Sequence, residues 1–362
     1  MLSRRALVLA LLAARGSCPA LAATASAPAP PGALAFPRDF GAHPASRIEW
    51  WYVTGSLEAA NRRWGFQITF FRAATGIVGA EASAFRAAQL VFAHAAVTDL
   101  ENARLLHDQR IARSGFGIAN ASTEDTAVTL RGWRLERSGS ADASRYRAVA
   151  ASETADFAFD LELEATQAVL VQGTGGVSQK GPNPTQTSRY YSEPQLAVRG
   201  TLVLARTPPV AVIGRGWLDH EWSDSLLDPI AVGWDWIGMN LDDGAALTAF
   251  RLRRADGTTL WAGGSHRPAR GETRNFAASA LSFAPGRLWT SPASKASYPV
   301  EWTITTPFGR FAIKAMQDDQ ELDSRASTGS IYWEGLSQLF DASGRIGYGY
   351  LEMTGYAARL VL

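Results

Sequence analysis

The densest group of side chains able to do chemistry lies in one short run, Gly214–Asp224, with the sequence GRGWLDHEWSD. If this run is a β-strand, His220 and Trp222 share one face, and Asp219 shares the other face with Trp217. A histidine beside a tryptophan on the inner face of a barrel could hydrogen-bond, protonate or orient a ligand. Alternatively, the run is a structural network in which its acids pair with nearby arginines. For His220 together with Trp222, both interpretations stay open.

A second group joins His43 to the motif EWWY, which begins at Glu49. On a strand, Glu49 and Trp51 face one way, while Trp50 and Tyr52 face the other. One of these pairs could line a cavity while the other closes the end of a barrel. For Glu49 itself, a structural role as a cap or ion-pair partner is the favoured interpretation.

Three histidines, His43, His94 and His220, could converge on a metal ion in three dimensions, but their spacing gives no argument for it. His94 stands alone in an apolar strand, which is typical of a buried, hydrogen-bonded core residue. The sequence has neither the HExxH motif of zinc enzymes nor the GxSxG motif of serine hydrolases. We therefore predict no metal site and no cofactor.

A glycine-rich segment spans Gln172–Pro182. It lacks the Gly-Lys-Ser/Thr ending of a phosphate-binding loop, and no helical pattern follows it. It is better interpreted as a long ordered loop over the mouth of a barrel, with rim contacts from Tyr190 and Tyr191.

The elements expected to position these residues are β-strands. Short apolar runs alternate with turn pairs such as Asp256-Gly257 and Asp243-Gly244, and no window of helical length keeps a convincing apolar stripe. Phe157–Leu163 shows the clearest alternation, with Phe and Leu on one face and mostly polar residues on the other. The pattern predicts an all-β fold.

A hairpin near the start of the chain has an echo in the second half. Trp50–Leu57 and Trp234–Leu241 align without a gap, and Tyr52 matches Trp236. Each copy places two aromatic rings on one face of a strand. The echo predicts two related β-domains that meet near residue 200. The expected ranges are 37–200 and 201–362.

The overall charge is close to balanced. Among 362 residues, 35 Lys and Arg stand against 34 Asp and Glu, for a formal net charge of +1. This balance gives no electrostatic signature of a nucleic-acid partner. The 12 Trp residues predict an aromatic core, pocket or interface.

Residues 1–22 have the features of an export signal. Arg4 and Arg5 precede a short apolar run, and Ala20–Ala22 fits an A-x-A cleavage site. Twin-arginine and ordinary secretory export both stay open. The single cysteine, Cys18, lies in this segment, so we expect no disulfide in the mature chain. The segment 23–36 is rich in Ala and Pro and is predicted to be a flexible lead-in. We expect a periplasmic or secreted protein without a transmembrane segment, which could act with an export or transport system.

Nine segments of the chain are shared with a known family. They are Phe36–Pro44, Ile48–Tyr52, Gly65–Arg72, Ala93–Asp99, Lys180–Pro182, Tyr190–Ser192, Asp219–Trp222, Tyr332–Gly335 and Gly349–Tyr356. Together they resemble the AttH-type lipocalin-like family, whose relatives include carotenoid 1,2-hydratases and kievitone hydratase. The resemblance covers nearly the whole mature chain. It implies two lipocalin-like β-barrels side by side and ligands that are long, apolar and unsaturated.

Aromatic side chains in such a barrel bury an apolar ligand and stabilise positive charge by cation–π attraction. We interpret the chain as an exported protein that binds an apolar small molecule such as a lipid or an isoprenoid. The alternative is a hydro-lyase similar to carotenoid 1,2-hydratase, which would protonate an isoprenoid alkene and add water. A secreted hydrolase is a weaker possibility, since the GxSxG motif is missing.

The resemblance also suggests the residues of the site. His220 and Trp222 match the His-x-Trp pair of the carotenoid hydratases, but their Tyr-x-Asp pair is missing from the following strand, Leu247–Arg251. Asp219 or Asp235 would have to replace the proton donor. The expected catalytic residues are His220, Asp219 and Asp235, and the expected ligand contacts are Trp222, Trp234, Trp236, Trp51, Tyr52, Tyr190 and Tyr191.

Overall fold

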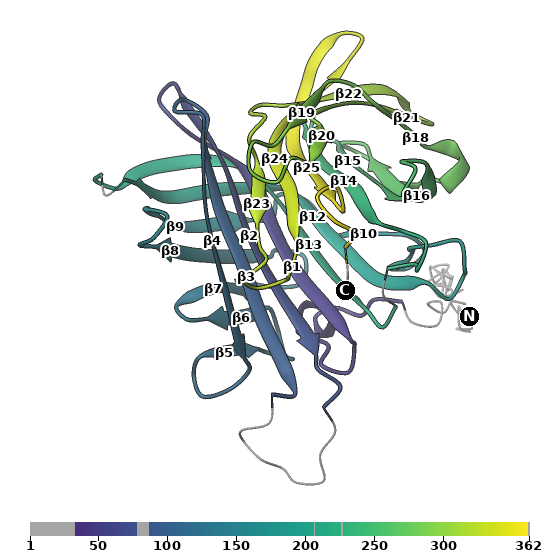
Figure 1. Cartoon of the computed structure of the whole chain (residues 1–362). Helices are drawn as coiled ribbons and strands as arrows, with labels where there is room; N and C mark the ends of the chain where they lie inside the picture. Colours follow the sequence, from purple (N-terminus) through teal and green to yellow (C-terminus); the bar gives the residue numbers. More distant parts are fainter. Residues whose placement is uncertain (1–32, 78–86, 206, 226, 361–362) are drawn as a thin grey trace, which may run out of the picture. The chain divides into compact units, whose positions relative to one another are not determined.

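The computed structural model describes residues 33–77, 87–205, 207–225 and 227–360. Within these ranges the secondary structure is almost entirely β-strand, which confirms the predicted fold class (Figure 1). The helical elements of this part are two 3-10 turns, η1 (Arg38–Phe40) and η2 (Ala278–Ala280). No helix in it has the length and hydropathy needed to cross a membrane. The predicted export signal and most of the lead-in lie outside the described residues.

The first sheet has 13 strands and rolls into a nearly closed barrel. Its main path is β4-β3-β2-β1-β13-β12-β9-β8-β7-β6-β5, and β10 and β11 also pair with β12. The ends of this path approach each other, because β3 contacts β5 and β6, and β4 contacts β6. The strands are β1 (Ile48–Ala59), β2 (Arg62–Ala74), β3 (Gln89–Asp99), β4 (Arg104–Arg113), β5 (Ala119–Ala121), β6 (Ala127–Leu130), β7 (Trp133–Ser138), β8 (Arg145–Ser152), β9 (Phe157–Glu164), β10 (Leu170–Val171), β11 (Val177–Gln179), β12 (Thr187–Leu204) and β13 (Val210–Ser223).

The second sheet has 10 strands and curls into a half-barrel (Figure 1). Its path is β17-β16-β15-β14-β25-β24-β22-β21-β18, with β23 paired to β24, and β19 and β20 form a separate hairpin. The strands are β14 (Gly233–Leu241), β15 (Ala246–Arg253), β16 (Thr259–Arg267), β17 (Arg274–Asn275), β18 (Ser282–Pro285), β19 (Leu288–Thr290), β20 (Ser297–Pro299), β21 (Glu301–Thr306), β22 (Gly309–Ala315), β23 (Glu321–Asp323), β24 (Ile331–Asp341) and β25 (Gly344–Thr354).

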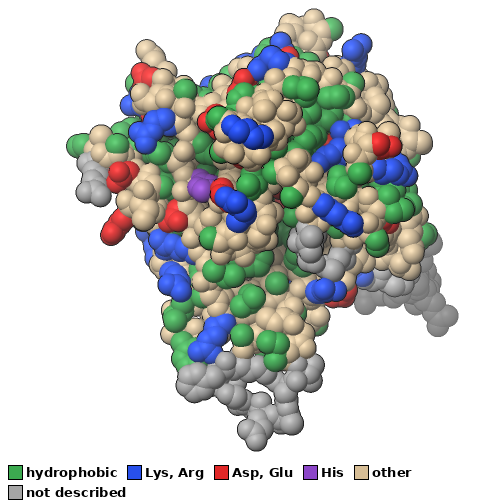
Figure 2. All heavy atoms as spheres, in the orientation of Figure 1, with side chains coloured by type: hydrophobic (Ala, Val, Ile, Leu, Met, Phe, Trp, Pro, Cys, Tyr) green, Lys and Arg blue, Asp and Glu red, His purple; other side chains and the backbone are tan. Residues whose placement is uncertain are grey.

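Alternating side chains build a separate core for each sheet. In β9, Phe157, Phe159, Leu161 and Leu163 are all buried in the first core, which confirms the predicted alternation. Burial of each such side chain contributes roughly 1.5–3 kcal/mol. The inner faces of β14, β15, β24 and β25 form the second core. On the face drawn in Figure 2, charged side chains of both signs are interspersed among exposed hydrophobic ones.

β12 contains a bulge that connects the two sheets. Its pairing with β13 shifts register between Glu193 and Leu196, and Gln195 adopts a left-handed φ of 59°. The Gln195 side-chain amide donates hydrogen bonds to the carbonyl oxygens of Leu241 and Ala245, at 2.9 and 2.7 Å. The extra residue of the bulge therefore ties β12 to the end of β14.

The chain passes from one sheet to the other between Ser223 and Gly233, whereas the predicted boundary near residue 200 falls inside β12. Gly200 marks a close approach rather than a turn, since a Cβ there would lie 2.1 Å from the Asp160 carbonyl oxygen. The division into two separate domains stays a prediction. Near the start of the described chain, the backbone N–H of Leu34 donates a hydrogen bond to the Gly175 carbonyl oxygen. The last part of the predicted lead-in therefore packs onto the barrel.

Candidate functional site

β13 separates two chemical environments. Leu218, His220 and Trp222 point into the first barrel, where Leu218 and Trp222 belong to the apolar core. Trp217 and Asp219 point toward the second sheet, where Trp217 joins an aromatic cluster built from both sheets. The alternation predicted for this run is confirmed, and it assigns the predicted site residues to two different places.

The barrel-side cluster consists of Asp39, His43, Glu49, Arg72, Tyr191, His220 and Trp222. Glu49 lies at its centre and is completely buried. His43 Nδ1 and His220 Nε2 lie 2.8 and 2.9 Å from the same Glu49 oxygen, Oε1, and Arg72 Nε donates to Oε2 at 2.7 Å. Burial opposes ionisation of Glu49, but its hydrogen bonds with His220 and His43 outweigh burial and hold its pKa well below the usual range.

Both imidazoles are also held from their far sides. His43 Nε2 lies 3.2 Å from Asp39 Oδ1, and His220 Nδ1 lies 3.1 Å from the Tyr191 hydroxyl. Burial lowers the pKa of His220, whereas for His43 the hydrogen bonds with Asp39 and Glu49 outweigh burial and raise the pKa. His220 has no exposed surface, so the centre of this cluster lies in the interior of the barrel.

Aromatic rings enclose these imidazoles. Trp222 stacks on His43 with ring centroids 3.6 Å apart, and Trp51 stacks on His220 at 4.6 Å. Four expected site residues therefore meet in the barrel: His220, Trp222, Trp51 and Tyr191. Tyr191 is completely buried and points into the barrel, so its expected place at the rim is wrong, while contact with a ligand stays a prediction.

The second environment lies between the sheets. Residues opposite each other on antiparallel strands share a face. In the first sheet Tyr52 lies opposite Asp219, and in the second sheet Glu352 lies between Glu334 and Trp236. The Tyr52 and Trp236 rings meet edge to face with centroids 5.3 Å apart, so the two faces are in contact. The inter-sheet cluster consists of Tyr52, Tyr190, Trp217, Asp219, Trp236, Phe250, Glu334, Tyr350 and Glu352.

Asp219 is the best-defined acid of the inter-sheet cluster. It is 4% exposed and accepts hydrogen bonds from the Tyr190 hydroxyl, the Ser192 hydroxyl and the Trp217 indole, at 2.7, 2.6 and 2.7 Å. Burial raises the pKa of Asp219 to about 7, although these hydrogen bonds favour the carboxylate. Asp219 is therefore a carboxyl group that exchanges its proton near neutral pH.

Two more acids, Glu352 and Glu334, belong to the inter-sheet cluster. Removal from water raises the pKa of Glu352 to about 7, and the charge of Asp219 adds to this effect. Burial raises the pKa of Glu334 well above its usual range, and the charge of Glu352 adds to it. Three carboxyl groups with raised pKa values thus lie among aromatic rings, an arrangement suited to proton transfer.

The glycine-rich segment ends beside the inter-sheet cluster. Lys180 Nζ pairs with Glu221 at 3.0 Å and lies 4.4 Å from the ring centroids of both Tyr190 and Phe250. Tyr190 is only 2% exposed, so its expected place at the rim is also wrong. It instead lies beneath Lys180 as a buried partner of Asp219.

Asp235 is placed away from both clusters. It faces the core of the second sheet, where Arg251 Nε, Arg253 Nη1 and the Tyr356 hydroxyl donate to it at 2.6, 2.9 and 2.9 Å. Its carboxylate is therefore committed to a buried ion-pair network. Trp234, the residue before it, is partly buried at the edge of the inter-sheet cluster.

A cavity of about 650 Å³ adjoins the inter-sheet cluster. Trp217, Leu336 and Tyr350 line it together with the charged side chains Arg215 and Arg345. Its volume falls in the range of small-molecule sites. Trp217 and Tyr350 belong both to the cavity lining and to the inter-sheet cluster, whereas Asp219, Glu334 and Glu352 do not line the cavity.

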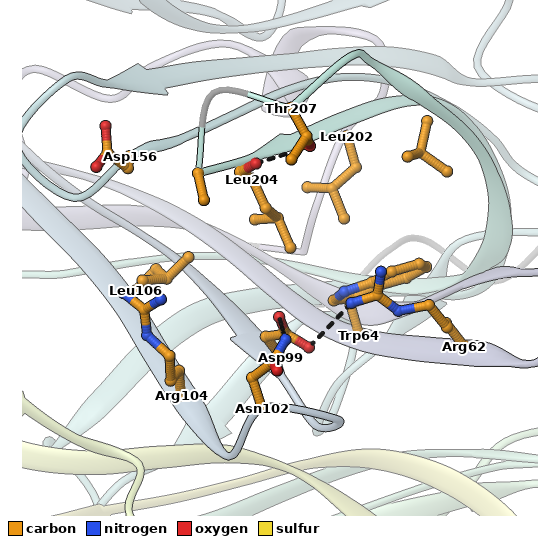
Figure 3. Close-up of a pocket in the computed structure, with 12 residues that line it drawn as sticks. Arg62, Trp64, Asp99, Asn102, Arg104, Leu106, Asp156, Leu202, Leu204 and Thr207 are labelled. Carbon is orange, nitrogen blue, oxygen red and sulfur yellow. Dashed lines mark hydrogen bonds and ion pairs between the residues drawn. The ribbon is translucent and has the colours of Figure 1, made fainter.

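A smaller cavity of about 240 Å³ lies at an end of the first barrel (Figure 3). The ion pair between Arg62 and Asp99, 3.6 Å apart, lies on one side of it, and Leu202 and Leu204 lie on the other. Its lining contains none of the expected site residues.

Sequence reasoning missed several of these groups. Arg72, Glu334 and Glu352 were not expected to take part, although Glu334 and Glu352 lie in the motifs YWEG and YLEM. One signal could have identified Glu334 and Glu352. Each is an acid among aromatic residues, on the strand face that alternation assigns to apolar side chains. His94 is buried and hydrogen-bonded to Tyr332 and Ser327, as expected of a core histidine.

Comparison with known proteins places this arrangement in a family. The sequence profile of the AttH-like family matches residues 27–356. Kievitone hydratase of Fusarium solani subsp. phaseoli is 24% identical over 214 residues, which are 58% of this chain and 58% of that relative. The match thus spans little more than half the length of this curated relative.

Solved structures agree with the fold. A crystal structure from Nitrosomonas europaea, described as a candidate AttH, has a TM-score of 0.83 at 45% identity and covers 91% of this chain and 99% of that one. The structure of kievitone hydratase from Nectria haematococca has a TM-score of 0.68 at 16% identity, covers 90% of this chain and 94% of that one, and shows the same fold. The chain therefore belongs to the AttH-like family, as its shared motifs predict.

Proposed function

We propose that this protein is a hydro-lyase that adds water to a carbon–carbon double bond of an apolar substrate, with Asp219 as the proton donor. The observation that carries the proposal is the environment of Asp219, a buried carboxyl group among aromatic rings with its pKa raised to about 7. Such a group keeps a transferable proton at neutral pH. Similarity to a relative named kievitone hydratase supports the same class of reaction.

In the proposed reaction, the Asp219 carboxyl proton adds to one alkene carbon, and the other carbon becomes cationic. The rings of Trp217, Trp236 and Tyr52 stabilise this cation by cation–π attraction. Water then forms the new C–O bond and gives a proton back to the carboxylate, which restores the acid. The sum of these steps is the addition of one water molecule.

The cavity beside Trp217 provides a place for such a substrate. Its aromatic side chains suit an isoprenoid or polyene chain, and its charged side chains, among them Arg215 and Arg345 paired with Asp242, suit a polar group at the other end of the molecule. Partly exposed Trp50 and Trp234 border the same cluster and add to the apolar surface.

The test is an Asp219→Asn variant, which keeps the size of the side chain but has no acidic proton. Wild-type and variant proteins are each incubated with retinol, lycopene or oleate in ¹⁸O-labelled water, and the labelled alcohols are quantified by mass spectrometry. We expect a loss of roughly 10²–10⁴ in rate with retained substrate binding. Asp224→Asn, at an exposed position directly after β13, is the matched control. Unchanged turnover in a folded Asp219→Asn protein would exclude Asp219 as the donor.

A carrier without turnover is the second candidate, and the cavity of about 650 Å³ is the observation that favours it. It predicts binding of the same compounds, measured by tryptophan fluorescence, with no labelled alcohol from any of them. We also propose that residues 1–22 direct export to the periplasm or the medium. N-terminal sequencing of exported protein should then give a chain starting near Ala23.

A further inference from the structure

We propose that His43, Glu49 and His220 form a binding site for a divalent transition-metal ion such as Zn²⁺, inside the first barrel and apart from the inter-sheet cluster. One ligand atom from each residue lies within 4.8 Å of those of the other two. His43 Nδ1 and His220 Nε2 both face Glu49 Oε1. His43 comes from the segment after η1, Glu49 from β1 and His220 from β13, so the fold brings together residues that are 171 positions apart.

The donor set matches the chemistry of such ions. Two imidazole nitrogens and one carboxylate oxygen are common ligands of Zn²⁺ and of other first-row metals, with bonds of about 2.1 Å. Adjacent ligands of such an ion lie roughly 3.0–3.4 Å apart. The two imidazole nitrogens lie 2.8 and 2.9 Å from Glu49 Oε1, and the ligand atoms of the three residues all lie within 4.8 Å of one another, so an ion would have to draw both rings into position around it.

The surroundings of the ligands are those of a metal site. Histidines that bind metals usually donate their second ring N–H to another group, which orients the ring. His43 has Asp39 in this position and His220 has the Tyr191 hydroxyl. Glu49 is held in the same way, because Arg72 occupies its second oxygen, Oε2. Each of the three ligands is therefore oriented by a hydrogen bond with a residue that is not itself a ligand.

The charges near the site also suit a cation. Two carboxyl groups, those of Glu49 and Asp39, contact the site against one buried arginine, Arg72, while Arg38, 3.4 Å from His43 Nε2, is exposed to solvent. The Trp222 and Trp51 rings, stacked on the two imidazoles, keep water away and strengthen the attraction. A purely structural network needs Glu49 Oε1 to accept from both rings; an ion would replace both ring protons at once.

Full-length mature protein without an affinity tag, freed of metal with a chelator, should bind one Zn²⁺ per chain in isothermal titration calorimetry. Co²⁺ should bind in its place and give visible absorption bands that report nitrogen and oxygen ligands. In a thermal melt, Zn²⁺ should raise the midpoint of the wild type. Failure to bind either ion in all three measurements would overturn the proposal.

Two variants locate the ion. His43→Gln keeps a hydrogen-bond donor beside Glu49 and should weaken Zn²⁺ binding by at least ~100-fold, because a direct ligand is lost. Asp39 orients His43 but is not a ligand, so Asp39→Asn should weaken Zn²⁺ binding by ~10–100-fold. This variant also tests the site if His43→Gln does not fold. His266→Gln, a histidine of β16 outside the site, is the control. Zn²⁺ binding that is equal in wild type, Asp39→Asn and His43→Gln would show that the ion lies elsewhere.

Discussion

Asp219 and His220 are neighbours in the chain, yet their side chains lie on opposite faces of β13 and belong to different clusters. Asp219 contacts Tyr190 and Trp217 between the sheets, whereas His220 contacts Glu49 and Tyr191 inside the barrel. The two residues were expected to act together, but they can be altered independently.

The rate of the proposed hydration should depend on the protonation of Asp219. Burial raises the pKa of this acid to about 7, so the donor is protonated below that pH and loses its proton above it. We expect kcat/KM to fall tenfold per pH unit above about pH 7. The control is circular dichroism over the same range, which should stay constant. A rate that is flat from pH 6 to pH 9 would contradict the assignment.

The same carboxyl group should reduce stability at high pH. Its pKa in the folded protein is raised above the ordinary value near 3.9, so its stabilising contribution is complete below about pH 4 and is lost as the pH rises through about 7. Asp219→Asn removes this dependence. The free energy of unfolding of the variant minus that of the wild type should be about 2–4 kcal/mol larger at pH 8 than at pH 5, because only the wild type loses stability over this range. Urea titrations at the two pH values measure this difference, and an equal difference at both would count against the raised pKa.

Trp236 and Trp222 should have different effects on ligand binding. Trp236 belongs to the inter-sheet cluster, so Trp236→Ala should weaken an apolar ligand by about 1–3 kcal/mol in a fluorescence titration with retinol. Trp222 stacks on His43 in the barrel, so Trp222→Ala should leave that affinity unchanged and lower the free energy of unfolding by about 3–5 kcal/mol. The reverse outcome would place the ligand in the barrel.

Replacement of Asp235 should lower the stability of the protein without changing its turnover. Asp235→Asn leaves Arg251 and Arg253 buried without their acid, and we expect a loss of about 3–5 kcal/mol in the free energy of unfolding. Glu301→Gln breaks the exposed pair with Arg287 and should cost less than about 1 kcal/mol. Turnover per folded molecule should stay at the wild-type level, which a catalytic role for Asp235 would not allow.

His220→Gln separates positioning from proton transfer. The amide can still donate to Glu49, so we expect a loss of about 1–3 kcal/mol in stability and a turnover within several-fold of wild type. A fall of roughly 10²–10⁴ in turnover with intact substrate binding would instead show that the barrel-side cluster handles the proton.

Local patterns predicted a good part of the fold. The alternation in Phe157–Leu163 and around His220 identified the buried faces correctly, because side-chain period in a strand depends only on neighbouring residues. Both segments of the aromatic echo are first strands of antiparallel hairpins, β1–β2 and β14–β15, while the relation of the two halves as repeated domains stays a prediction.

The composition of the clusters could not be predicted in the same way. Glu49 meets His220 only because β1 pairs with β13, and Glu352 faces Asp219 only because the sheets pack together. Pairing between distant strands leaves no trace in either segment alone.

The bulge at Gln195 shifts the alternation of inward and outward side chains in β12 by one residue, so the two halves of the strand follow different patterns. Tyr191, before the bulge, and Leu196, after it, both face the first barrel although five positions separate them. Without the extra residue, the odd spacing would turn one of them outward. Deletion of a single residue here would therefore exchange the inward and outward faces of half the strand, and Tyr190 would exchange places with Tyr191 if that half shifted. For this reason we expect that insertions and deletions at this point are tolerated far less well during evolution than any single substitution on either side.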